Sequence, residues 1–149
     1  MVELSGSSDL SIEELARIMQ LHRRFVEGRK DGLRADLKHR NFTGMKLRGL
    51  NFRGAVLAGC DFGGADVSGC DFSTADLFGA NFRKATAVKV NFERADLRGA
   101  DFRGAVVNGS NFMEADLRPG QLMMAGTGRK DGPTISNRHG NGIVSPVVV

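Results

Sequence analysis

The chain has 149 residues and a formal net charge of +4, with 41% hydrophobic and 26% charged residues. This length fits one domain, and a composition so close to that of ordinary soluble proteins argues against both a disordered chain and a membrane protein. The positive charge is too small to indicate a nucleic-acid partner by itself.

Residues 1–34 form an N-terminal segment with one predicted helix. Ser11 and Glu14 have the spacing of a capping box, and Gly28 is typical of a helix end. Apolar residues between these signals recur at helical spacing. The sequence therefore predicts an amphipathic helix of about residues 12–27 that caps the segment following it. The alternative is that its apolar stripe binds a partner or a second copy of the chain.

A strict five-residue period governs residues 35–119. Seventeen consecutive units follow one another without an insertion, and every second unit has Phe at its centre. The residue two before the centre is Ala in ten units, and the residue directly before it is Asp or Asn in thirteen. In a helix, residues two apart would lie about 200° apart around the axis, whereas in an extended chain they share one face. Each unit is therefore predicted to be a very short strand followed by a tight turn.

Units such as Ala-Asp-Leu-Arg-Gly at 95–99 and Ala-Asp-Phe-Arg-Gly at 100–104 resemble the pentapeptide repeat family, and the resemblance covers residues 35–119. It implies an all-β solenoid, a right-handed quadrilateral parallel β-helix with four pentapeptides in each coil. Seventeen units then give about four coils, with the N-terminal helix as a cap. The predicted core consists of the stacked centres Phe42, Phe52, Phe62, Phe72, Phe82, Phe92, Phe102, Phe112, Leu57, Leu77, Leu97 and Leu117.

The β-helix is expected to extend over residues 35–124, with residues 121–124 as one degenerate last unit. Residues 125–149 are rich in Gly, Asn and Pro and have no period, which is typical of a disordered tail or of a truncated remnant. A solenoid exposes unpaired strand at an uncapped end. Because the last coil has no recognisable cap, we expect a homodimer through the C-terminal coil.

The sequence predicts no catalytic, cofactor-binding or metal site. The three His are scattered, and His22 on the helix stripe is expected to be a packed helix residue. Cys60 and Cys70 occupy the small inward position on opposite inner walls, which favours core packing over a disulfide. The Asp or Asn before each centre is expected to bond to the turn backbone. Two cysteines, and an N-terminus at residues 1–8 without the features of a signal peptide, indicate a cytoplasmic protein.

Basic residues gather in the last two coils, on two adjacent faces of the predicted rod. Phe78 and Val88 are predicted to point outward among them. The candidate interaction surface comprises Arg83, Lys84, Lys89, Arg94, Arg98, Arg103, Arg118, Phe78 and Val88. The alternative is a solvated face whose cations are balanced by the neighbouring Asp residues.

These observations favour a non-enzymatic pentapeptide-repeat protein that acts as a rigid protein–protein interaction or scaffold module. A protein partner is expected, and a membrane is not. One alternative is a DNA mimic that modulates DNA gyrase or topoisomerase, as some family members do, but those members are longer and acidic, whereas this rod is short and basic. The other is weak nucleic-acid binding through the basic face, although Phe78 is the one exposed aromatic expected there.

Overall fold

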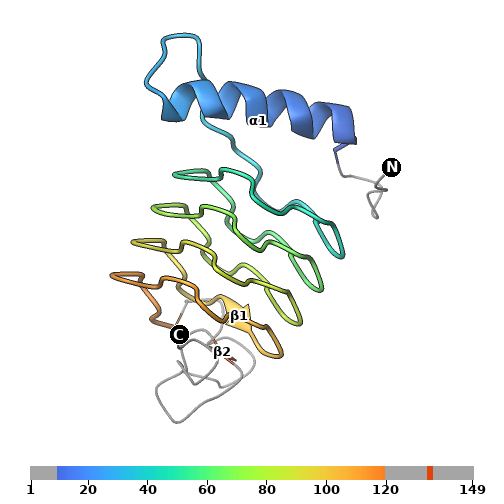
Figure 1. Cartoon of the computed structure of the whole chain (residues 1–149), viewed down its shortest axis with the longest axis vertical. Coiled ribbons are helices and arrows are strands. Elements are labelled where there is room, and N and C mark those ends of the chain that lie inside the picture. The colour runs from blue at the N-terminus through green and yellow to red at the C-terminus, as the bar shows by residue number, and fades with distance from the viewer. Residues whose placement is uncertain (1–9, 120–133, 136–149) are drawn as a thin grey trace.

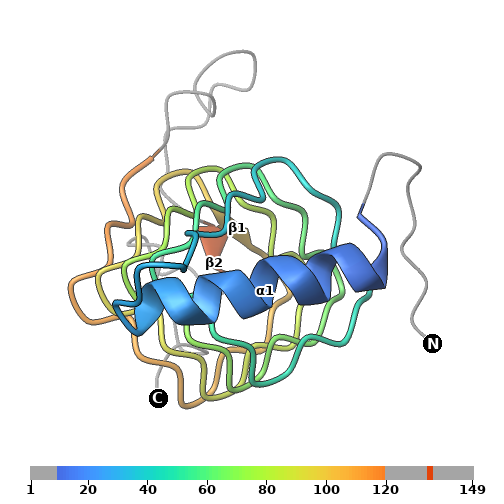
Figure 2. The ribbon, with the colours of Figure 1, turned by 90° about the horizontal axis from the view of Figure 1, so that it is seen from above.

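A computed structural model describes residues 10–119 and 134–135. Its elements are helix α1 (Ile12–Val26) and the strands β1 (Asp101–Phe102) and β2 (Thr134–Ile135). The chain between α1 and β1 winds into a stack of coils (Figure 1). Helix α1 lies across the first coil when the stack is viewed along its length (Figure 2). The predicted solenoid with an N-terminal helix is therefore confirmed.

Helix α1 begins and ends with signals that are local in the sequence. The Ser11 hydroxyl accepts a hydrogen bond from the Glu14 N–H at 3.0 Å, and the Glu14 carboxylate accepts one from the Ser11 N–H at 3.1 Å. These two bonds complete the predicted capping box. At the other end Gly28 has a φ of 80°, and the Arg29 N–H donates to the Arg24 carbonyl at 2.9 Å. A left-handed Gly with this bond is a common way to end a helix.

The apolar stripe of α1 covers the first coil, as predicted. Leu15 and His22 are buried there, and His22 is fully enclosed. The His22 Nδ1 accepts the Ala35 N–H at 3.0 Å, so its Nε2 carries the proton and donates to the Arg53 carbonyl at 2.9 Å. His22 thus joins the helix to both the start and the end of the first coil.

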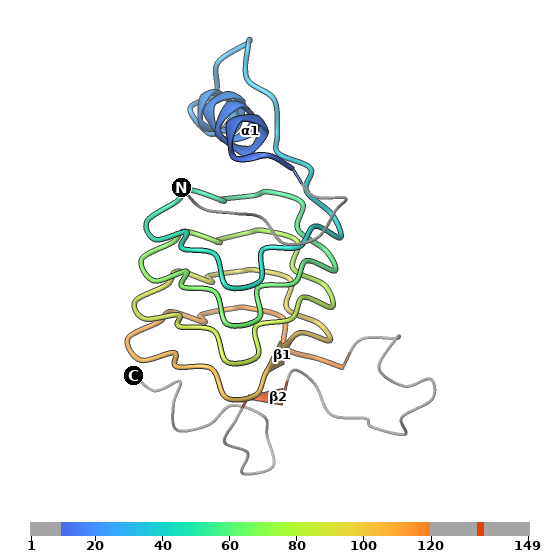
Figure 3. The ribbon, with the colours of Figure 1, turned by 90° about the vertical axis from the view of Figure 1, so that its right-hand side faces the viewer.

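Each coil contains twenty residues and pairs with the next through single parallel bridges. Residue 36 pairs with residue 56, 56 with 76, 76 with 96 and 96 with 116, and the other three sides of the coil follow the same rule. Backbone bonds of 2.7–3.1 Å accompany these bridges, such as that from the Phe42 N–H to the Asp61 carbonyl at 2.7 Å. The coils lie directly above one another (Figure 3). This is the predicted parallel β-helix of pentapeptides.

Tight turns form the corners of each coil. In the corner after Phe52, the Ala55 N–H donates to the Phe52 carbonyl at 2.9 Å, and Gly54 has a φ of 70°, as in a type II turn. The Asn or Asp before each centre supports the turn, since Asn51 Oδ1 accepts the Arg53 N–H at 2.9 Å. Equivalent bonds recur around the coils, which confirms the predicted role of these side chains.

Two ladders of Phe rings fill the interior of the rod. Rings one coil apart are stacked, with centroids 4.8–5.4 Å apart, and rings of opposite ladders meet edge to face at 5.6–5.9 Å. Ten of the predicted core residues are fully buried: Phe42, Phe52, Phe62, Phe72, Phe82, Phe92, Phe102, Leu57, Leu77 and Leu97. Phe112 and Leu117 differ from the prediction because they are only partly buried. They lie in the last described coil, and the structure describes no complete coil beyond them.

Strand β2 pairs in parallel with β1, so that Thr134 is opposite Asp101 and Ile135 is opposite Phe102. The twenty-residue register of the coils would have placed residues 121 and 122 there. The predicted degenerate unit at 121–124 lies outside the described residues. The same holds for the predicted tail at 125–149, apart from β2.

Candidate functional site

The candidate residues lie on all four faces of the rod, which we number by their core columns. Face 1 has its centres at residues 37, 57, 77, 97 and 117, face 2 at 42, 62, 82 and 102, face 3 at 47, 67, 87 and 107, and face 4 at 52, 72, 92 and 112. In each unit the residue after the centre lies on the outer surface and the next residue forms the corner. The structure brings together Phe78, Arg98 and Arg118 on face 1 and Arg83, Lys84 and Arg103 on face 2. Val88 and Lys89 belong to face 3 and Arg94 to face 4, so these three are not part of the group on the two adjacent faces.

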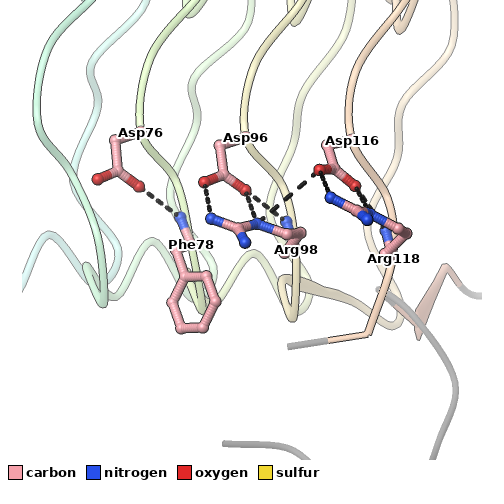
Figure 4. A network of polar contacts seen from close by, with 6 residues as sticks. All are labelled: Asp76, Phe78, Asp96, Arg98, Asp116 and Arg118. Carbon is pink, nitrogen blue, oxygen red and sulfur yellow. Dashed lines mark hydrogen bonds and ion pairs between the residues drawn. The ribbon is translucent and has the colours of Figure 1, made fainter. Parts of the chain in front are cut away.

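On face 1 each Arg binds the Asp of its own unit. Arg98 donates to both oxygens of Asp96 at 2.8 and 2.7 Å, and Arg118 donates to both oxygens of Asp116 at 2.9 and 2.8 Å (Figure 4). Arg98 also lies 3.9 Å from Asp116 in the next coil. Such two-pronged bonds fix a planar guanidinium in place. Face 1 therefore presents charges that are already neutralised and held at a fixed spacing.

The same contacts shift the protonation of the face 1 carboxyls. The hydrogen bonds from Arg98 hold the pKa of Asp96 below its usual value, and those from Arg118 lower the pKa of Asp116. Phe78 is partly buried, and the Arg98 guanidinium lies 5.2 Å from the centre of its ring. Phe78 is therefore one side of a cation–π contact, and not the freely exposed aromatic that the sequence predicted.

On face 2 the cations outnumber the carboxylates that they can reach. Arg103 donates to both oxygens of Asp101 at 2.6–3.2 Å, and Arg83 lies 3.7 Å from the same carboxylate. Lys84 forms the next corner with a φ of 61°. Within the described part of the chain, Lys84 has no ion-pair partner. Face 2 therefore carries the less compensated part of the predicted basic surface.

A shallow depression of about 530 Å³ opens on face 2 beside these cations. Its lining consists of Thr43, Asp61, Gly63, Gly64, Asn81, Arg83, Lys84, Arg103 and Gly104. Sequence reasoning identified the cations but missed the glycines that create the depression. Two adjacent Gly at the outward and corner positions of one unit are the signal that could have revealed it.

The remaining candidates have separate surroundings. Arg94 forms an exposed ion pair with Glu114 of the next coil at 2.7 Å. Val88 is partly buried, and its N–H donates a hydrogen bond to the Ser68 hydroxyl oxygen at 3.2 Å. Lys89 is an exposed left-handed corner with a φ of 57°. These three residues therefore do not share one surface with the cations of face 2.

The buried titratable groups have structural roles. Burial lowers the pKa of His22, and both of its ring nitrogens are already bonded. Cys60 and Cys70 are free thiols whose S–H groups donate to backbone carbonyls at 2.9 Å, and burial raises the pKa of each to about 12. In residues 10–119 and 134–135, no three His, Cys, Asp or Glu side chains are grouped so that they could hold a metal ion. In the same residues, no helix has the length and apolar character needed to cross a membrane.

Comparison with known proteins matches the Pentapeptide repeats family in eight copies, over residues 35–73 and 75–118. Among solved structures, the chain is similar to the pentapeptide repeat protein Rfr23 from the cyanobacterium Cyanothece 51142, with 28% identity and a TM-score of 0.53. That match covers 56% of this chain and 56% of Rfr23, so the chain spans about half of that relative. No curated protein matches the chain.

Two further solved structures are similar in sequence over a larger share of their own length. A pentapeptide repeat protein from Nostoc Pcc 7120 is 31% identical, with 59% of this chain and 77% of that chain covered and a TM-score of 0.36. One from the Arabidopsis thaliana thylakoid lumen is 29% identical, with 64% and 83% covered and a TM-score of 0.31. The family match extends over more than half of the chain and over the same units that form the coils. The solenoid is thus a right-handed quadrilateral β-helix, and the chain belongs to the pentapeptide repeat family.

Proposed function

We propose that this protein is a non-enzymatic interaction module, a short rigid rod that presents fixed side chains on faces 1 and 2 to a protein partner. The observation that carries the proposal is the in-unit pairing of Arg98, Arg103 and Arg118, each held by two bonds to its own Asp. Side chains ordered before binding lose less conformational freedom when a partner docks, which favours association. The structural roles of His22, Cys60 and Cys70 support a module without catalysis or a cofactor.

The experiment is a pull-down from native lysate with the full chain as bait, with and without nuclease. The comparison variant is Arg83→Ala/Arg98→Ala/Arg103→Ala. A protein that survives nuclease and is lost with the variant supports the module and its surface. Recovery that disappears with nuclease indicates nucleic-acid binding instead, and recovery of gyrase or topoisomerase subunits indicates the DNA-mimic alternative. If both baits recover the partner equally, the cations of faces 1 and 2 do not take part in binding and are only solvated.

A homodimer through the C-terminal coil is a second part of the proposal. The partly buried Phe112 and Leu117, together with the exposed Met113, leave apolar surface at this end of the described rod. Strand β2 already occupies the edge of β1, so a second copy would contact these side chains and not that edge. We expect light scattering to show a dimer that Met113→Glu weakens. A monomer at high concentration would rule out the dimer.

A cytoplasmic location remains our proposal for the compartment. Family membership does not decide it, since one of the similar structures comes from a thylakoid lumen. The two buried, unpaired thiols fit a reducing compartment. Fractionation of cells that express the chain from its own gene would test this location directly.

A further inference from the structure

The units that carry an outward Arg differ in the residue that precedes their core centre. Three of them have Asp there and hold their Arg by two bonds: Asp96–Arg98, Asp101–Arg103 and Asp116–Arg118. The unit of Arg83 has Asn81 in this place. Asn81 Oδ1 accepts the Arg83 backbone N–H at 2.8 Å, and its Nδ2 donates to Asp61 at 2.8 Å. A neutral amide cannot form an ion pair with the guanidinium, so Arg83 has no carboxylate in its own unit.

The carboxylate nearest to Arg83 already accepts hydrogen bonds from another Arg. Asp101 lies 3.7 Å from the Arg83 Nε, while both of its oxygens accept shorter bonds from Arg103. A guanidinium has five N–H donors, and about half of the Arg83 side chain, 52%, is exposed. Arg83 therefore retains donors that can reach a ligand.

Lys84 stands at a corner where the same face otherwise uses Gly. Gly44, Gly64 and Gly104 have φ values of 70°, 65° and 75°, and Lys84 adopts a φ of 61° in the same column. A side chain in this left-handed region is less favourable than Gly, and five other corners of the described rod also carry one: His39, Thr74, Lys89, Arg94 and Glu114. The Lys84 stem leans over the corner of the next coil, where a Cβ on Gly104 would come within 3.2 Å of the Lys84 Cγ. Lys84 and Arg83 both line the depression, and we call these two cations its rim.

The depression itself exists because one unit has no outward side chain. Gly63 and Gly64 occupy the outward and corner positions, between Thr43 on the coil before and Arg83 on the coil after. One missing row spans about two strand spacings, near 10 Å, which is enough for one extended peptide segment. The floor contains the Asp61 carboxylate, which already accepts the Gly63 N–H at 2.8 Å.

We infer that this depression binds an acidic segment of the partner protein. Carboxylate side chains of the segment pair with Arg83 and Lys84 on the rim, and backbone N–H groups of the segment donate to Asp61 on the floor. A phosphate or a nucleic-acid backbone would supply the anions without those N–H donors and would face the Asp61 carboxylate. The inference rests on the proposed function and identifies where, and by what chemistry, the partner docks.

The test is a fluorescence-anisotropy titration of the full chain with a fluorescein-labelled hexaglutamate peptide at low salt. The variant Arg83→Gln/Lys84→Gln removes both rim cations. The control Lys46→Gln/Arg48→Gln removes one Lys and one Arg from face 3, so that the net charge falls equally. We expect the rim variant to bind about tenfold more weakly, as for the loss of two charge-assisted contacts, and the control to stay within about twofold of the original chain.

A third variant removes no cation. Asn81→Asp gives Arg83 a carboxylate in its own unit, and the column Asp76, Asp96 and Asp116 of face 1 shows that three stacked Asp are compatible with the fold (Figure 4). We expect this variant to weaken hexaglutamate binding as well. Thermal unfolding followed by circular dichroism checks that each variant remains folded.

The inference is overturned if the original chain does not bind hexaglutamate, or if the rim and control variants lose affinity equally, which would mark a response to net charge alone. It is also overturned if a single-stranded DNA of six phosphates binds more tightly and with the same sensitivity to the rim variant. The proposed function fails on a different result, namely when the lysate pull-down yields no nuclease-resistant partner. If the original chain and the rim variant retain a partner equally, the proposed interaction module is supported and the proposed docking site in the depression is wrong.

Discussion

The two ends of the rod close the same core in different ways. At the N-terminal end α1 lies over the first coil, and Leu37 and Phe42 are almost completely buried beneath it. At the C-terminal end Leu117 lies in the column of Leu37, and Phe112 lies in the Phe ladder opposite that of Phe42, but both remain partly exposed. The repeat thus determines which side chains face inward, and what lies beyond the first and last coils determines how deeply they are buried.

A consequence is that residues with the same place in the repeat contribute unequally to stability. A ring in the middle of a ladder is stacked on both sides, as Phe72 is by Phe52 and Phe92. Phe112 stacks on Phe92 alone within the described residues. Because each unit of a solenoid contacts only its neighbours, the stability of each end depends on what packs against its terminal coil.

The largest expected effect compares these two rings directly. Phe72→Ala removes a fully buried ring and should cost about 3–5 kcal/mol in the free energy of unfolding, enough to unfold much of so small a rod. Phe112→Ala should cost about 1–2 kcal/mol, because half-burial removes less apolar surface from water. Urea denaturation of both variants measures the difference. Equal costs would mean that the C-terminal coil is covered as fully as the middle.

Removing the anchor of the N-terminal cap should have the next largest effect. His22→Ala leaves the Ala35 N–H and the Arg53 carbonyl without their partner, which should lower the free energy of unfolding by about 2–3 kcal/mol. His22→Gln, which can both accept and donate, should recover part of this loss. Arg23→Ala on the exposed side of the same helix serves as the control and should change little. A full-length chain unaffected by His22→Ala would show that α1 does not secure the first coil.

The helix cap allows a smaller test of the same end. Ser11→Ala removes the hydroxyl that accepts the Glu14 N–H, and an N-cap of this kind contributes about 1 kcal/mol. Glu13→Gln leaves the capping box intact and is the matched control. Urea denaturation should separate the two variants. If Ser11→Ala unfolds at the same urea concentration as the control, the start of α1 does not limit the stability of this end.

Much of the architecture was predictable because the pentapeptide period repeats a local rule. The columns of Phe52 and Phe72, the corner at Gly54 and the capping box at Ser11 all follow from residues close in the sequence. The partial exposure of Phe112 was not predictable, since a period carries no information about what covers its last unit. The partner of His22 was equally hidden, because the Arg53 carbonyl lies 31 residues away.

The candidate surface was predictable in composition but not in pairing. The sequence places Arg83 and Arg98 in the same class of outward cation. Only the stacked coils show that Arg98 is satisfied by Asp96, while Arg83 must share Asp101 with Arg103. That difference traces to a single Asn at position 81, whose importance becomes visible once the coil geometry is known.

The smallest effect concerns pH and should be confined to the capped end. Burial lowers the pKa of His22 below its ordinary value of 6.5, so the unfolded chain takes up a proton at a higher pH than the folded chain. Stability is therefore complete above about pH 7 and falls as the pH drops through 6.5 toward the folded-state pKa. Between pH 7 and pH 6 the loss is at most about 0.7 kcal/mol, the cost of protonating one His of pKa 6.5 in the unfolded chain. The measurement is the difference between the original chain and His22→Gln at both pH values, which cancels the other His residues. A difference that does not change with pH would show that His22 titrates alike in both states, and that the neutral ring is not what holds α1 to the first coil.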